Sequence, residues 1–197
     1  MAKKRAALTS RKPKTTWGKI WDFLWNSDSI LSWIADLVLL YIIVKWIFFP
    51  ALGFFLSTSM PSLIVESGSM IHQGNFDSWW ENYGWWYTEQ NITKAEVEKW
   101  PYHNGINKGD IVVLRGAKNL NIGDVIIFDV GQRVPIIHRV IKNDTTISTK
   151  GDNNQGQLSV EGSISQKQII GRTIFRIPKL GWAKLFFVDI FRGIFKS

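Results

Sequence analysis

The sequence predicts a mainly β domain, either a small antiparallel barrel or a sheet, with one N-terminal transmembrane helix and a Trp-rich, partly helical insertion. Three patterns support this prediction. A long apolar run occupies residues 30–56, short runs rich in β-branched residues continue to residue 178, and tryptophans crowd residues 71–107. The 197 residues suffice for one domain with a hydrophobic core and an anchor, but not for two full domains.

Residues 1–29 are expected to form a cytoplasmic basic tail that includes an interfacial helix. Two acidic residues, Asp22 and Asp28, stand against a set of basic residues: Lys3, Lys4, Arg5, Arg11, Lys12, Lys14 and Lys19. An excess of Lys and Arg beside an apolar span marks its cytoplasmic side. Apolar residues recur at helical spacing at Trp17, Ile20, Trp21, Leu24 and Trp25. A basic arm for nucleic acid explains this distribution less well, so no nucleic acid partner is expected.

Residues 30–56 are predicted to be a transmembrane anchor. An α-helix needs about 20 apolar residues to cross the hydrocarbon layer, and this run is longer. A cleaved signal peptide fits less well. The basic and apolar regions of this chain are longer than those of a signal peptide, and no small-x-small cleavage site follows them. Asp36 and Lys45 interrupt the run. Either each charge reaches water from near a helix end, or a partner helix supplies a counter-charge.

Residues 57–178 are predicted to be the folded domain, built from β-strands. Turn residues separate the runs, as in Lys108-Gly-Asp110 and Ile122-Gly-Asp124. No helical pattern alternates with the runs, which favours antiparallel pairing. The expected strands are 111–114, 125–128, 134–141, 145–149 and 169–177.

The insertion at residues 71–107 does not follow the strand pattern. It is rich in tryptophan and poor in aliphatic residues. Thr93-Lys-Ala-Glu96 before Val97 is a capping-box start, which predicts a short helix. The tryptophans either form a small core of their own or contact lipid headgroups, where Trp is favoured.

Residues 179–197 are predicted to be an amphipathic tail on the membrane surface. Apolar residues crowd one side of residues 183–195, while Lys184, Arg192 and Lys196 share another face. The segment is too charged and too short to predict a second span, and a helix packed into the domain core is the alternative.

Three residues form a coherent candidate site for nucleophilic catalysis. Ser69 lies in Ser67-Gly-Ser-Met70, where the glycine permits a tight turn, His138 follows an apolar run, and Asp152 lies in a Lys-Gly-Asp-Asn-Asn turn. A serine hydroxyl needs a neighbouring base to take its proton, and a third group usually orients that base. The chain has no cysteine, and its three histidines have no second ligand at metal spacing, so no metal or other cofactor is expected.

The order of these motifs resembles the signal peptidase I family, in its archaeal and endoplasmic-reticulum type. The resemblance extends from the serine motif across the later strands, outside the insertion. It implies that Ser69 attacks the scissile carbonyl, that His138 acts as the general base, and that Asp152 orients His138. It also implies an oxyanion hole made by the backbone N–H of Ser69 and the hydroxyl of Ser67.

The sequence departs from this family in its acids and in the length of its insertion. Relatives commonly carry a second aspartate soon after the Gly-Asp-Asn turn, whereas Leu158 stands near that place here and the nearest acid is Glu161. Either Asp152 acts alone, or Glu161 substitutes through a shifted loop. The insertion is longer than in many relatives. Lys150 is a second candidate base, but the neighbouring Asp152 favours its charged form, so His138 is preferred.

The resemblance implies a serine endopeptidase of an archaeal cell membrane that removes signal peptides, with its protease domain at residues 57–178 outside the cytoplasm. Preproteins with signal peptides and the lipid bilayer are the expected partners, and the protein-export translocon is a candidate partner. The alternatives are another membrane-anchored Ser-His processing protease of surface proteins and a non-catalytic, membrane-tethered binding module. Sequons at Asn91 and Asn143 would face outward in this topology.

Overall fold

The structure is a computed structural model that describes residues 15–186. The chain divides into two compact units, residues 1–51 and 52–197. The predicted basic cluster within residues 1–14 and most of the predicted tail helix at 183–195 lie outside the described residues.

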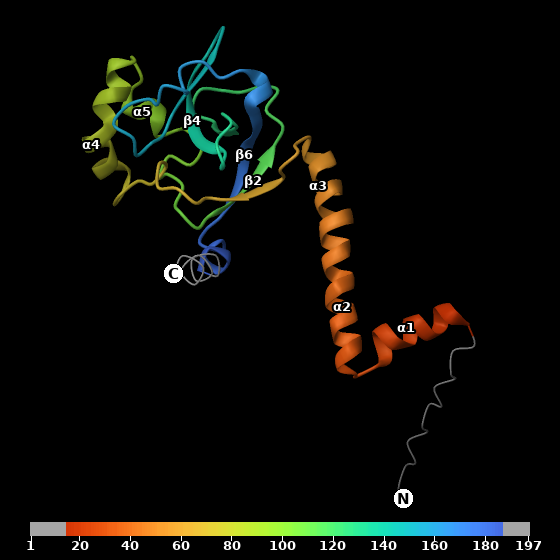
Figure 1. Cartoon of the computed structure of the whole chain (residues 1–197). Helices are drawn as coiled ribbons and strands as arrows, with labels where there is room; N and C mark the ends of the chain where they lie inside the picture. The colour runs from red at the N-terminus through yellow and green to blue at the C-terminus, as the bar shows by residue number, and fades with distance from the viewer. Residues whose placement is uncertain (1–14, 187–197) are drawn as a thin grey trace, which may run out of the picture. The chain divides into compact units, whose positions relative to one another are not determined.

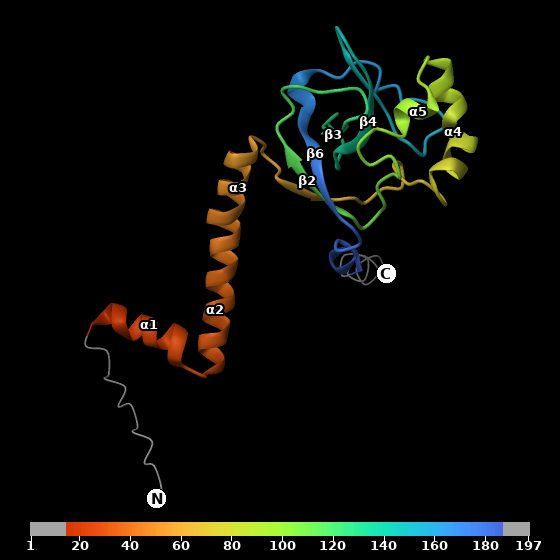
Figure 2. The ribbon, with the colours of Figure 1, turned by 180° about the vertical axis from the view of Figure 1, so that it is seen from behind.

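The first unit begins with a short capped helix. Helix α1 (Thr16–Asn26) starts at Thr15, whose hydroxyl accepts a hydrogen bond from the backbone N–H of Gly18 at 3.1 Å. After a sharp turn, the buried Ser32 hydroxyl of the next helix donates to the carbonyl of Phe23 at 2.5 Å. This bond ties the two helices together across the turn (Figure 2).

A continuous helical segment, Ile30–Leu56, follows the turn. It consists of α2 (Ile30–Ile43), a π-helical turn η1 (Val44–Phe48) and α3 (Phe49–Leu56). The wider turn precedes Pro50, which has no backbone N–H to donate to the turn before it. The segment has 27 residues and a mean hydropathy of 2.2. Its length of about 40 Å exceeds the hydrocarbon layer, so this helix of the described residues is long and apolar enough to cross a membrane.

The second unit is built on a six-stranded antiparallel sheet (Figure 1). The strand order is β1-β2-β6-β3-β4-β5, so the last strand of the chain lies between β2 and β3 and joins the two halves of the sheet. The strands are β1 (Ser62–Ile64), β2 (Ile111–Arg115), β3 (Val125–Phe128), β4 (Ile136–Asn143), β5 (Ile147–Lys150) and β6 (Ile169–Ile177).

Strand β3 shows why the central runs are apolar throughout. Successive side chains of a strand point to opposite faces, and both faces of this sheet are covered. Val125 and Ile127 therefore belong to one buried cluster, together with Val65 and Met70. Ile126 and Phe128 belong to another. The second cluster consists of Ala117, Leu120, Ile126, Phe128, Val140 and Ile164.

The antiparallel sheet is confirmed, whereas the mainly β class and the barrel are wrong. Strands β1 and β5 remain at opposite ends of the strand order, so the sheet does not close. Helices in both units make the described chain a mixture of α and β structure. Within residues 15–186 no further strand pairs with the outer edge of β1, and a cavity described below lies against it.

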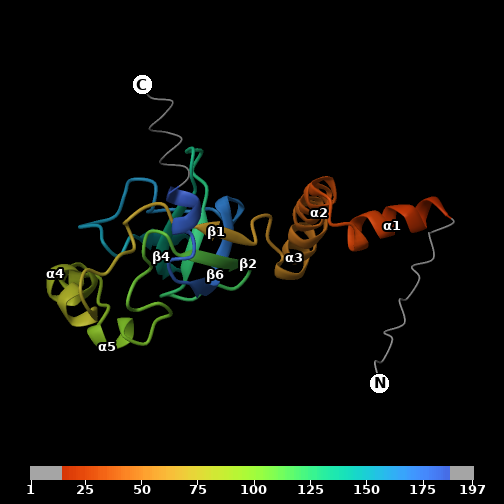
Figure 3. The same cartoon turned by 90° about the horizontal axis from the view of Figure 1, so that it is seen from below.

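The insertion folds into two helices that share a small aromatic core. Helix α4 (Phe76–Glu89) is capped by Asn75, and α5 (Lys94–Val97) begins with the predicted capping box of Thr93 and Glu96. The two helices lie together beside β4, on the side that faces away from β2 (Figures 1 and 3). Their buried cluster consists of Phe76, Trp79, Trp86, Tyr87, Val97 and Ile141. Of the two readings of the tryptophans, this packing matches the small core.

Candidate active site

The serine motif follows edge strand β1 and is fixed at both ends. Val65 N donates to Asp110 O at 2.9 Å, and Gly109 N donates to Val65 O at 2.8 Å. These two bonds continue the pairing of β1 past its last residue. At the other end Met70 is fully buried in the core. The residues between, including the half-buried Ser69, therefore form a short loop with little freedom of position.

Two hydroxyl groups meet in this loop. The Oγ atoms of Ser67 and Ser69 lie 3.2 Å apart, within hydrogen-bond distance, and either can donate. Ser69 lies in a turn that is closed by a hydrogen bond from Ile71 N to Gly68 O at 3.2 Å. The predicted pair of Ser67 and Ser69 is thus brought together on one exposed turn.

His138 lies on β4, opposite Ile126 of β3, and its ring is almost fully buried. Its Nδ1 atom hydrogen-bonds Oε1 of Glu161, which is also fully buried. The same carboxylate accepts from Thr149 Oγ1 at 3.0 Å and from Leu158 N at 2.6 Å. An ionised carboxylate only accepts hydrogen bonds, so Nδ1 must donate to it, and the ring can then take up a proton only at Nε2.

A cavity of about 460 Å³ brings the serine loop and the histidine to one surface. Ser67, Ser69 and His138 all line it, and the remaining lining is largely aliphatic. The described structure contains no hydrogen bond between Ser69 and His138, and catalytic hydrogen bonds often tighten only when substrate binds. Gly151 borders the ring, because a Cβ atom there would lie 2.7 Å from His138 Nε2.

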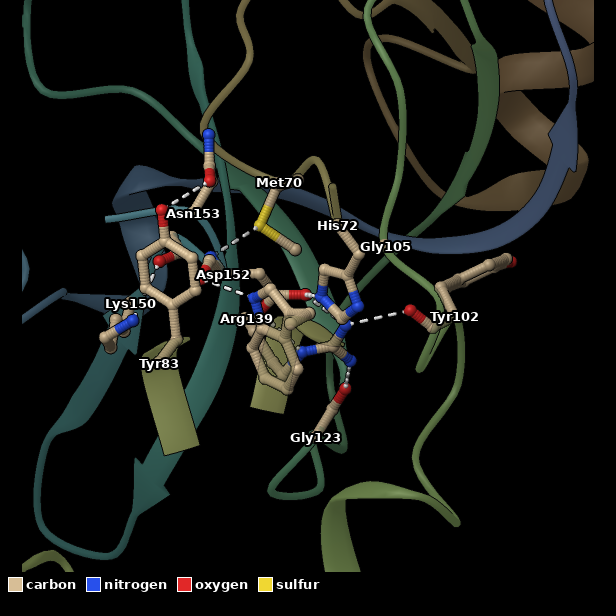
Figure 4. Close-up of polar contacts among 12 residues, drawn as sticks. Met70, His72, Tyr83, Tyr102, Gly105, Gly123, Arg139, Lys150, Asp152 and Asn153 are labelled. Atoms are coloured by element: carbon tan, nitrogen blue, oxygen red, sulfur yellow. Dashed lines mark hydrogen bonds and ion pairs between the residues drawn. The ribbon is translucent and has the colours of Figure 1, made fainter. Parts of the chain in front are cut away.

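Asp152 does not orient His138, which corrects the prediction. Its carboxylate receives two bonds from Arg139, Nε to Oδ1 at 2.9 Å and Nη2 to Oδ2 at 2.7 Å. His72 Nε2 bonds Oδ2 at 3.0 Å, and the Tyr87 hydroxyl donates to Oδ1 at 3.2 Å. Figure 4 shows Asp152 beside Arg139 and His72. The acid that contacts His138 is Glu161, the substitute that the sequence left open.

The charges around Asp152 compensate one another. Burial alone would raise the pKa of Asp152, but the charge of Arg139 and hydrogen bonds from His72 and Arg139 hold that pKa well below its ordinary value. Burial would lower the pKa of Arg139, and the charge and hydrogen bonds of Asp152 raise it instead. Burial and the charge of Asp152 raise the pKa of Tyr87 well above its ordinary value. Across the physiological pH range Asp152 and Arg139 therefore stay ionised and Tyr87 stays neutral.

Lys150, the second candidate base, is fully buried behind the site. Its Nζ lies 5.2 Å and 5.0 Å from the ring centres of Trp86 and Tyr87 and donates to Gly151 O at 3.0 Å and Asn154 O at 2.8 Å. Burial lowers its pKa to about 8. Lys150 does not line the cavity that contains Ser69, so its position does not favour it as a base.

Sequence reasoning did not assign three members of the buried cluster: His72, Tyr87 and Arg139. Arg139 follows His138 directly, and adjacent strand residues point to opposite faces. This alternation could have predicted the role of Arg139. If His138 points to the cavity, Arg139 must point to the opposite face of the sheet, where its buried charge needs an acid as a partner. No group of three or more His, Cys, Asp or Glu side chains in residues 15–186 could hold a metal ion.

Comparison with protein-family models finds no match to this chain, and comparison with curated proteins finds none either.

Proposed function

We propose that this chain is a membrane-anchored serine endopeptidase of the signal peptidase type, which removes signal peptides from exported preproteins. One observation carries the proposal. Ser69 and His138 line the same cavity. The buried Glu161, which does not line the cavity, binds Nδ1 of His138. A nucleophile, a base and an orienting acid form the constellation that serine proteases use on unrelated folds.

The chemistry follows from the hydrogen bonds of His138. Because Nδ1 donates to Glu161, Nε2 is free to accept the proton of Ser69 as Oγ attacks the scissile carbonyl. The imidazolium that forms is stabilised by the carboxylate of Glu161. It then returns the proton to the leaving amine, and water completes the cycle by hydrolysing the acyl-enzyme.

The oxyanion hole would be formed by the serine loop itself. The carbonyl oxygen becomes negatively charged when Ser69 attacks. Its proposed donors are the backbone N–H of Ser69 and the hydroxyl of Ser67, whose Oγ lies 3.2 Å from Ser69 Oγ. Removing one oxyanion donor typically lowers the rate by about 100- to 1000-fold.

The free edge of β1 supports an extended substrate. A peptide segment can add to an unpaired strand edge through backbone hydrogen bonds, and alternate side chains then enter the cavity. The cavity walls include Leu63, Val65, Val134, Ile137 and Leu158. Such aliphatic walls favour small apolar side chains near the cut, as in a small-x-small cleavage site.

The anchor supports a substrate held in the same membrane. The proposed orientation, with the N-terminus in the cytoplasm, rests on the basic residues that precede the helix. Residues 57–69 can extend at most about 45 Å, so the serine would lie close to the outer membrane surface. A signal peptide, itself an apolar helix in the bilayer, would present its end at that height.

The test is cleavage of a preprotein with a small-x-small site by the full-length chain in liposomes. We expect cleavage at that site and a rate at least about 10,000-fold lower for Ser69→Ala. The matched control is Ser163→Ala, the same chemical change at an exposed position of the same unit, which should cleave at the wild-type rate. Equal cleavage by Ser69→Ala would contradict the mechanism. Cleavage confined to surface proteins without signal peptides would favour the other anchored protease.

A further inference from the structure

Asn153 connects the Trp-rich helix α4 to the peptide groups on either side of Ser69. The backbone N–H of Asn153 donates to Ser69 O at 2.7 Å, and its side-chain Nδ2 donates to Gly68 O at 3.1 Å. Its Oδ1 accepts from the hydroxyl of Tyr83 on α4 at 2.8 Å. Figure 4 shows the Tyr83 ring reaching Asn153. Asn153 thus binds the peptide groups on both sides of the Ser69 Cα atom, and Tyr83 binds Asn153.

These bonds fix the direction of the proposed oxyanion donor. In a trans peptide the carbonyl and the N–H that share the peptide plane point in opposite directions. The carbonyl of Gly68 and the N–H of Ser69 belong to one such plane. When Asn153 holds the Gly68 carbonyl, it therefore also sets where the Ser69 N–H points.

The Tyr83 hydroxyl sets the orientation of the Asn153 amide. An amide side chain can rotate by half a turn and exchange its acceptor for its donor. Because the Tyr83 hydroxyl donates to Oδ1 of Asn153, Nδ2 faces the Gly68 carbonyl and donates to it. With the amide rotated by half a turn, Oδ1 would face the Gly68 carbonyl, and both atoms are acceptors. Tyr83 therefore acts on the serine loop through Asn153 without contacting it.

Helix α4 is itself fastened to this turn at neighbouring positions. Trp79 Nε1 donates to Asp152 O at 2.9 Å, and Tyr87 OH donates to Asp152 Oδ1 at 3.2 Å. Trp79, Tyr83 and Tyr87 are spaced four residues apart, so they lie along one face of the helix. The ring of Trp79 also stacks on His72 at 3.9 Å between ring centres. One face of α4 therefore supports the turn that carries Asn153.

We infer that Tyr83 and Asn153 are positioning residues, through which the Trp-rich insertion orients the Ser69 N–H for transition-state binding. The inference rests on the proposed function. An insertion that only formed its own core would not need to bond the turn next to the serine loop. Tyr83 and Asn153 control the rate of the chemical step and not the binding of substrate, since neither residue lines the cavity.

The test compares Tyr83→Phe with Tyr102→Phe in the full-length chain. Each variant loses one hydroxyl, and the Tyr102 hydroxyl forms no hydrogen bond in the described structure. We expect Tyr83→Phe to lower kcat by about 3- to 10-fold with an unchanged KM, consistent with loss of one hydrogen bond. Asn153→Ala should lower kcat further, by about 10- to 100-fold, and Tyr102→Phe should keep the wild-type kcat.

Two further readouts separate positioning from loss of folded enzyme. Rates are expressed per active site, counted by titration with a fluorophosphonate. A peptide aldehyde, which forms a tetrahedral adduct, should bind Tyr83→Phe more weakly by the same factor as kcat falls. A product peptide, which forms no adduct, should bind the variant and the wild type equally. Wild-type kcat and aldehyde affinity in Tyr83→Phe would overturn the inference and leave the proposed function intact. A wild-type chain that neither cleaves preprotein nor reacts with the fluorophosphonate would overturn both.

Discussion

Two fully buried carboxylates bind adjacent residues of β4: Glu161 binds His138, and Asp152 binds Arg139. Asp152 is paired with the guanidinium of Arg139, and its other bonds come from His72 and Tyr87. Glu161 is bound by a hydroxyl, a backbone N–H and the ring of His138. Both acids have every oxygen satisfied, but only Asp152 has a permanent cation as its partner.

The comparison shows how neighbouring residues of one strand divide two tasks. His138 and Arg139 point to opposite faces, so each selects its own acid. A charge pair of constant state, such as Arg139 and Asp152, contributes to stability and fixes the turn that carries Asn153. In the proposed mechanism His138, held by Glu161, takes up a proton and returns it. The distinction predicts different consequences for removing each acid.

The largest expected effect is on catalysis. Glu161→Gln keeps the size of the side chain but removes the charge that stabilises the imidazolium, so kcat should fall by about 1000- to 10,000-fold. The free energy of unfolding of this variant should fall by about 1 to 3 kcal/mol, because the Gln oxygen keeps its bonds to Thr149 and His138 while the amide nitrogen faces the N–H of Leu158. Preprotein cleavage and thermal unfolding measure the two quantities. Glu98→Gln, at an exposed position of the insertion, is the matched control.

The next largest effect is on stability. Asp152→Asn leaves the buried Arg139 without its counter-charge, so the free energy of unfolding should fall by about 3 to 5 kcal/mol. At a temperature where the variant is folded, kcat should stay within about tenfold of wild type, far above that of Glu161→Gln. Denaturant titration and cleavage assays check both values. If Asp152→Asn lost as much activity as Glu161→Gln at full folding, the division of tasks would be wrong.

The pH dependence of stability sharpens the same comparison. The folded-state pKa of Asp152 lies below its unfolded value, so its stabilisation is present above about pH 4 and is lost as the pH falls below that value. The difference in unfolding free energy between wild type and Asp152→Asn should therefore narrow from pH 5 to pH 2. Urea titrations over this range measure it. A constant difference would contradict the charge pair.

The smallest expected effect comes from a buried charge with no acid bound to it. Lys150 has a folded-state pKa of about 8, below its ordinary value of 10.5, so the unfolded chain binds more protons between these pH values. The wild type should gain stability relative to Lys150→Met as the pH rises from 8 to 10.5. Parallel stability curves for the two proteins would show that the rings and carbonyls around Lys150 offset its burial.

Much of the fold could be predicted because local patterns determine it. The strand at residues 125–128, the helix at 30–56 and the capped helix after Thr93 all lie within the predicted ranges. Strand β1 was missed because its three residues form a strand only by pairing with β2. Helix α4 was missed because its aromatic residues are weak helix formers, although their recurrence at helical spacing after Asn75 was a usable signal.

The proposed nucleophile and the proposed base could be singled out from the sequence, whereas the carboxylate that contacts His138 could not. Ser69 and His138 are marked by short motifs, and both reach the cavity. The acid depends on which carboxylate the folded loop brings to β4, and sequence spacing does not determine that. Asp152 is nearer to the histidine along the chain, yet Arg139 binds it more strongly than a neutral ring could.

The most direct test of the central claim is the site and rate of fluorophosphonate labelling, measured by peptide mapping with mass spectrometry. If His138 and Glu161 activate Ser69, the wild type should carry the adduct on Ser69, and Glu161→Gln should label about 100- to 1000-fold more slowly. Asp152→Asn should label at nearly the wild-type rate while it is folded. An adduct on another serine, or equal labelling rates for wild type and Glu161→Gln, would contradict the account.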